Sequence, residues 1–162
     1  MATVTVSFTP LPAHVRTARF IAASVARRAG VADSLLDEIR LAVSEACSLA
    51  VRFHMAHAPT APVQVRLTDS TDRFSIEVAD AVARSALVDL GSDVTLNLDA
   101  DLDADLDADD LDADGRTSGG TTDSDLRSHE RIGLAVINGL VDDVSVGYLD
   151  DGSVVTMRWP IA

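Results

Sequence analysis

LLDEIRLAVSEACSLAVRFH, residues 35–54, is the stretch of this sequence that most strongly predicts a local structure. Its apolar residues follow the spacing of one face of an α-helix, at Leu35, Ile39, Ala42, Ala46, Leu49 and Phe53. Asp33 or Ser34 can cap the first amides, and Asp37 and Glu38 place negative charge where the helix dipole favours it. The pattern therefore predicts a helix with one buried face.

Four ionisable side chains in or just after this stretch are candidates for a functional role. Glu45 lies at the edge of the apolar face, and the simplest interpretation is that its carboxylate reaches out to water. Cys47 is the only cysteine, so we expect a buried thiol and no disulfide within the chain. His54 and His57 lack further ligands for a metal, and we interpret them as cationic partners for carbonyls near the helix end.

The net charge of −13 is concentrated in one segment. Of the 26 acidic residues, 14 lie between Asp89 and Glu130, and residues 98–109 repeat Leu-Asp-Ala-Asp. We expect 89–130 to be an acidic, disordered insert. The rest of the chain has neither a basic nucleic-acid footprint nor a run of about 18 apolar residues, which predicts a cytoplasmic protein without direct nucleic-acid or membrane partners.

The residues outside the insert predict a mixed fold. Alternating apolar residues predict strands at 2–8, 63–67, 74–78, 144–149 and 153–159. Helical spacing predicts a first helix at 13–29, ended by Gly30, and a last helix at 132–140. At 162 residues the chain fits one domain, 1–162, and the order of elements predicts an α+β two-layer sandwich, with a mostly antiparallel sheet and three helices on one face.

Two runs of sequence resemble a known family. DEIRLAVSEACSLAV, residues 37–51, resembles the N box of the anti-sigma factor serine/threonine kinases of the RsbW and SpoIIAB type, which belong to the GHKL (histidine-kinase-like) ATPase superfamily. GLAVINGLVDDVSVGYLDDGSVVTMRW, residues 133–159, is similar to the family's closing helix and hairpin. The resemblance implies the GHKL fold along the chain, with the acidic insert at the position of the lid over ATP.

The resemblance also implies a degenerate nucleotide site. Glu45 matches the glutamate that helps to activate a partner's serine, but Leu49 replaces the asparagine that holds Mg²⁺, and a hard cation needs oxygen ligands. Asp80 matches the aspartate that accepts from the adenine amino group, with Val82 and Arg84 in place of two glycines. These departures predict that metal binding and catalysis are lost.

The third motif of the family, G-x-G-L, cradles phosphates at the start of the last helix. Arg131, Gly133 and Leu134 match it, with an arginine, which can still pair with a phosphate, in place of the first glycine. An acidic lid would repel a triphosphate. We therefore expect a vestigial ATP site without a cofactor or a metal, and Mg-ATP binding is the alternative.

The resemblance implies an anti-sigma-type regulator that acts by partner switching. Its partners would be a sigma factor and a STAS-domain anti-anti-sigma factor, and it would form a homodimer. One alternative is an active ATP-dependent serine kinase that phosphorylates the STAS protein, with Glu45 as base. A second alternative, from another class, is that the acidic tract mimics a nucleic acid and occupies a basic surface on a partner.

Overall fold

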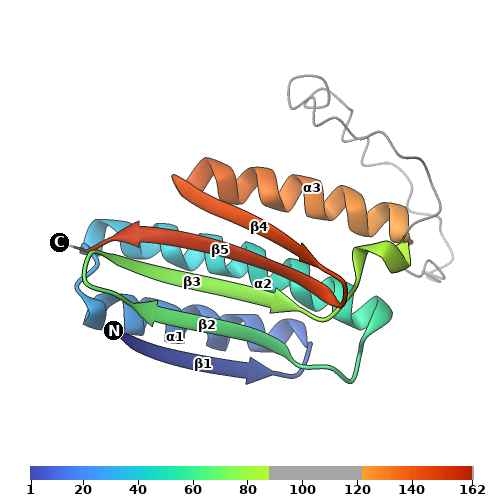
Figure 1. Ribbon diagram of the computed structural model, residues 1–162, viewed down its shortest axis with the longest axis horizontal. Helices are drawn as coiled ribbons and strands as arrows, with labels where there is room; N and C mark the ends of the chain where they lie inside the picture. Colours follow the sequence, from blue (N-terminus) through green and yellow to red (C-terminus); the bar gives the residue numbers. More distant parts are fainter. Residues whose placement is uncertain (88–121, 162) are drawn as a thin grey trace, which may run out of the picture.

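The computed structural model describes residues 1–87 and 122–161, in which five strands form one antiparallel sheet (Figure 1). The elements are β1 (Ala2–Phe8), α1 (Pro12–Ala29), the 3₁₀ turn η1 (Asp33–Leu35), α2 (Leu36–His57), β2 (Val63–Asp69), β3 (Arg73–Asp80), the 3₁₀ turn η2 (Arg84–Leu87), α3 (Asp123–Leu140), β4 (Asp143–Leu149) and β5 (Gly152–Pro160). The strand order is β1-β2-β3-β5-β4. The three helices lie against one face of the sheet, which confirms the predicted α+β sandwich.

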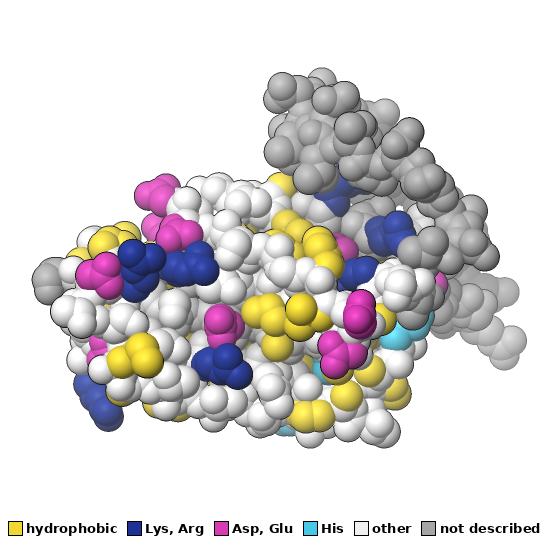
Figure 2. Space-filling view, in the orientation of Figure 1, with side chains coloured by type: hydrophobic (Ala, Val, Ile, Leu, Met, Phe, Trp, Pro, Cys, Tyr) yellow, Lys and Arg dark blue, Asp and Glu magenta, His cyan; other side chains and the backbone are white. Residues whose placement is uncertain are grey.

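The two faces of the sheet follow from the alternation of the strand sequences. The helix-facing side is apolar, with buried side chains at Val63, Val65 and Leu67 of β2, Phe74, Ile76 and Val78 of β3, and Val155, Met157 and Trp159 of β5. The opposite face is mostly polar, with Ala79 and Val154 among its apolar residues. On it Arg66 and Glu77 lie directly opposite each other, with Nη1 3.1 Å from Oε2. Figure 2 looks onto this face and shows charged side chains in small groups over the strands.

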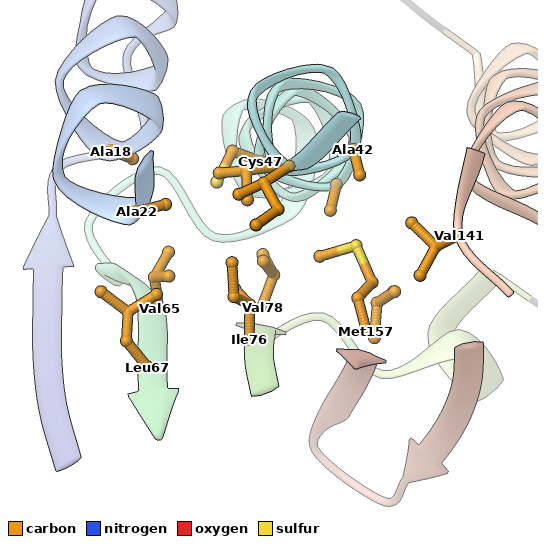
Figure 3. Packing of buried hydrophobic residues seen from close by; sticks show 14 of the residues in the cluster. Ala18, Ala22, Ala42, Cys47, Val65, Leu67, Ile76, Val78, Val141 and Met157 are labelled. Carbon is orange, nitrogen blue, oxygen red and sulfur yellow. The ribbon is translucent and has the colours of Figure 1, made fainter. Parts of the chain in front are cut away.

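Helix α2 is the central helix and packs against α1, α3 and the sheet. Alanines at Ala18, Ala22 and Ala26 form the buried side of α1, and such small side chains allow a close approach to α2. In Figure 3, Cys47 and Ala42 of α2 lie above Ile76, Val78 and Met157 of the sheet. The buried face predicted for this helix is therefore confirmed.

The start of α2 differs from the sequence prediction. The helix begins at Leu36, after the turn η1, and neither Asp33 nor Ser34 makes a side-chain capping hydrogen bond. It ends at His57, in agreement with the prediction that His54 and His57 lie near the helix end. The last turn brings the end of α2 to the start of α3, where Nε2 of His57 lies 2.7 Å from Oδ1 of Asp123.

Helix α3 begins at Asp123, inside the segment that the sequence assigned to the acidic insert, so the predicted boundary at 130 is wrong. The start is fixed by a capping box, in which Thr122 Oγ1 accepts from the Asp125 N–H (3.1 Å) and Asp125 Oδ2 accepts from the Thr122 N–H (2.9 Å). The Leu-Asp-Ala-Asp repeat at 98–109 lies outside the described residues.

No helix in the described ranges, 1–87 and 122–161, is both long enough and apolar enough to span a membrane.

Gly152, the first residue of β5, allows β5 to meet the end of β3. A Cβ at Gly152 would lie 1.9 Å from the carbonyl oxygen of Asp80. We predict that Gly152→Ala lowers the free energy of unfolding by about 2 kcal/mol or more, because the backbone must shift to remove this overlap. The measurement is urea unfolding followed by circular dichroism. Gly147→Ala is the control, since a Cβ there meets nothing within 4 Å. Equal losses in both variants would contradict the prediction.

Cys47 is fully buried, and burial raises the pKa of its thiol to about 12. Because the thiolate is the reactive form, we predict that the folded protein does not react with a thiol reagent at pH 8, whereas the urea-unfolded chain reacts fully. The unfolded chain also releases this proton first, so the contribution of Cys47 to stability is lost as the pH rises from about 8.5 toward 12. Rapid labelling of the folded protein would contradict the prediction.

Candidate functional site

Glu45, Leu49 and Phe53 follow one another at intervals of four along one flank of α2. Leu49 and Phe53 are buried, whereas Glu45 is half-buried. Within the part of the chain that the structure describes, the Glu45 carboxylate makes no hydrogen bond or ion pair. On the α2 side, the site thus consists of the apolar side chains of Leu49 and Phe53 and of the Glu45 carboxylate, which has no partner among the described residues.

Leu49 packs directly against α3 at Gly133. A Cβ at Gly133 would lie 2.7 Å from Cδ1 of Leu49, so a larger residue at position 133 would require the Leu49 side chain to shift. Since α3 runs without a break from Asp123 to Leu140, Gly133 lies inside the helix, where each backbone amide donates to a carbonyl four residues earlier. This corrects the prediction that Arg131, Gly133 and Leu134 lie at the helix start, where amides are free to hold phosphates.

Asp80, at the end of β3, is held by the side chain of Arg84. Arg84 Nη1 donates to Asp80 Oδ1 at 3.1 Å, and Nη2 donates to Oδ2 at 2.9 Å. The Val82 N–H also donates to Oδ1 (3.0 Å), and Ser153 Oγ donates to Oδ2 (2.7 Å). Each oxygen therefore accepts two hydrogen bonds, which fills the acceptor capacity of a carboxylate.

Arg84 has a second acidic partner and an aromatic one. Its Nε donates to Glu130 Oε1 of α3 at 3.0 Å, and its guanidinium carbon lies 3.8 Å from the centroid of the Phe53 ring. Burial alone would lower the pKa of Arg84, but the hydrogen bonds and negative charges of Asp80 and Glu130 outweigh burial and raise this pKa above its ordinary value. The guanidinium is therefore charged and links α3 to the end of β3.

The position of Arg84 could not be read from the sequence, which only showed that it stands where the family has glycine. Its partners Glu130 and Ser153 are far away in the chain, and no spacing motif connects them to Asp80. Ser153 was expected only as a strand residue, and residue 130 as the end of the insert. The tertiary structure alone brings these residues together.

His54 is fully buried and hydrogen-bonded through both ring nitrogens. Nδ1 lies 2.8 Å from the Ala61 carbonyl oxygen, and Nε2 lies 2.9 Å from the Ala81 amide nitrogen. The carbonyl can only accept and the amide can only donate, so the ring is neutral with its proton on Nδ1. This corrects the interpretation of His54 as a cation near exposed carbonyls. The spacing of Cys47, Ala50 and His54 along the apolar face was the signal for burial.

The residues present do not fit Mg-ATP as they are arranged. Leu49 offers no oxygen to a metal ion, Asp80 has no acceptor left for an adenine amino group, and the amides around Gly133 belong to the interior of α3. In the described ranges, no cluster of three or more His, Cys, Asp or Glu residues could hold a metal ion.

We predict that His54→Leu lowers the free energy of unfolding by about 2 kcal/mol, because two hydrogen bonds are lost and the Ala81 N–H is left without its acceptor. His57→Leu, which removes a partly exposed pair with Asp123, is the control and should cost less than about 1 kcal/mol. Urea unfolding at pH 7 measures both. A His57 variant that loses as much as the His54 variant would contradict the assigned role of His54.

A family model described as the histidine kinase-like ATPase domain matches residues 8–159, from the end of β1 to β5. No curated protein matches the chain.

Proposed function

Because the chain belongs to the histidine kinase-like ATPase domain family, we propose that it is an anti-sigma-type regulator that binds other proteins and does not transfer phosphate. In this proposal it binds a sigma factor as a homodimer, and a STAS-domain anti-anti-sigma factor competes for it. Relative affinities and concentrations then decide which complex forms. The family match supports the domain type, and the resemblance of residues 37–51 to the anti-sigma factor kinases supports this specialisation.

The packing of Leu49 against Gly133 is the observation that carries the proposal. A kinase of this family needs an oxygen ligand at position 49 and free amides near position 133. Here an apolar contact joins these two places, and it closes the space between α2 and α3 at that point. Admission of a metal and phosphates would require α3 to move away from α2, with exposure of buried apolar surface.

The proposal is tested by binding of the purified protein to candidate sigma factors and STAS-domain proteins, with and without Mg-ATP. We expect affinities that do not change when Mg-ATP is added. Binding that requires Mg-ATP, or transfer of labelled phosphate to a STAS protein, would overturn the proposal in favour of an active serine kinase with Glu45 as base.

Deletion of residues 96–118 separates the proposal from the alternative in which the acidic tract is a nucleic-acid mimic. The deletion retains every described element, including the Thr122 cap of α3. Partner binding should survive it if the folded domain forms the interface. Loss of binding in the folded deletion variant would support the mimic.

We predict that Leu49→Asn lowers the free energy of unfolding by about 2 kcal/mol, because a polar group replaces a buried apolar one, and that this variant does not gain Mg-ATP binding. Combining Leu49→Asn with Val82→Gly and Arg84→Gly should raise the affinity for the nucleotide, since these changes also free Asp80. Calorimetry measures the binding. Leu41→Asn, at an exposed position of the same helix, is the control for stability. Saturable micromolar binding of Mg-ATP to the unaltered protein would contradict the prediction.

A further inference from the structure

We propose that Asp80, Glu130, Ser153 and Phe53 form a guanidinium-binding site, which the folded chain fills with its own Arg84. The site belongs to the isolated chain and needs neither a nucleotide nor a protein partner. Its existence therefore does not depend on the regulatory role proposed above.

The hydrogen bonds of Arg84 match the five N–H donors of a guanidinium. Nε donates to Glu130 Oε1 (3.0 Å). Nη1 donates to Asp80 Oδ1 (3.1 Å) and to the carbonyl oxygen of Val82 (2.7 Å), and Nη2 donates to Asp80 Oδ2 and to Ser153 Oγ (2.9 Å each). Every donor has an acceptor, which is the condition for burying a planar cation.

Aromatic rings face the plane of the guanidinium, and two carboxylates balance its charge. Its carbon lies over the Phe53 ring at 3.8 Å, within the range of a cation–π interaction, and the Tyr148 ring centroid is 6.0 Å away. The side chains of Asp80 and Glu130 are only 6% and 15% exposed, so without a cation these two carboxylates would lie largely buried and unpaired. The pocket therefore selects a planar cation over an ammonium or a neutral group.

The site joins four elements at one point. Asp80 ends β3, Ser153 lies in β5, Phe53 belongs to α2 and Glu130 to α3. Beneath the guanidinium, Phe53, Val82 and Leu126 form a small apolar cluster separate from the main core. Arg84 thus links the first half of α3 to the sheet, at the carboxylate that matches the adenine-binding aspartate of the family.

Chemical rescue of Arg84→Ala tests the site in the full-length chain. We expect the melting temperature to fall by about 10 °C and amide exchange at 123–133 to accelerate at least about ten-fold, because two buried carboxylates lose their cation. Millimolar guanidinium chloride should restore at least half of both changes in a saturable manner, and sodium chloride at equal ionic strength should not. Absence of rescue, or equal rescue by sodium chloride, would overturn the proposal.

Two further variants complete the test. Arg66→Ala removes an exposed arginine paired with Glu77 on the open sheet face, and it should show little loss and no guanidinium response. Arg84→Lys keeps the charge without the planar fork, so it should still melt at least about 5 °C lower than the unaltered protein and accelerate exchange in α3. If Arg84→Ala does not fold, Arg84→Lys decides the question. A melting temperature and an exchange rate in α3 equal to those of the unaltered protein would then overturn the proposal. These readouts involve no partner, so their failure is distinct from a failure of partner binding.

Discussion

Helix α2 must bury apolar side chains toward α1, α3 and the sheet at once, and the arrangement of the other elements depends on this constraint. Its apolar surface is wider than one stripe. Ile39, Val43 and Cys47 belong to the main core, while Leu49 and Phe53 extend the apolar surface along a second flank. A helix with so broad an apolar surface cannot lie at the edge of a two-layer sandwich, so α1 and α3 must cover it on either side.

The second flank of α2 sets the character of the candidate site. Leu49 packs against α3 at Gly133, and the Phe53 ring lies against the guanidinium of Arg84. A carboxylate buried at this place needs a charged partner, and Arg84 satisfies it. The two departures from the family pattern, at positions 49 and 84, therefore act together. Leu49 closes the space between α2 and α3, and Arg84 fills the acceptor positions of the Asp80 carboxylate.

These features bear on the proposed role of this ATPase-family domain as a binding protein. The fold that holds a nucleotide between a sheet and a helix is retained, but side chains of the chain itself make the contacts between those layers. Under the proposed function, competition between partners, and not phosphate transfer, would decide which complex forms.

The periodicity of the sequence determined the fold class and the position of each strand and helix core, because burial on one face imposes a period of 2 or 3.6 on any chain. The buried position of Cys47 followed from the same pattern. The start of α3 did not, since its capping box lies among acidic residues that mask the helical signal. The environment of His54 and the partners of Arg84 were decided only by the tertiary structure. Hydrogen bonds from Arg84 to Glu130 and Ser153 join residues that no local spacing connects, and only the packing of α3 and β5 around the end of β3 places them within reach.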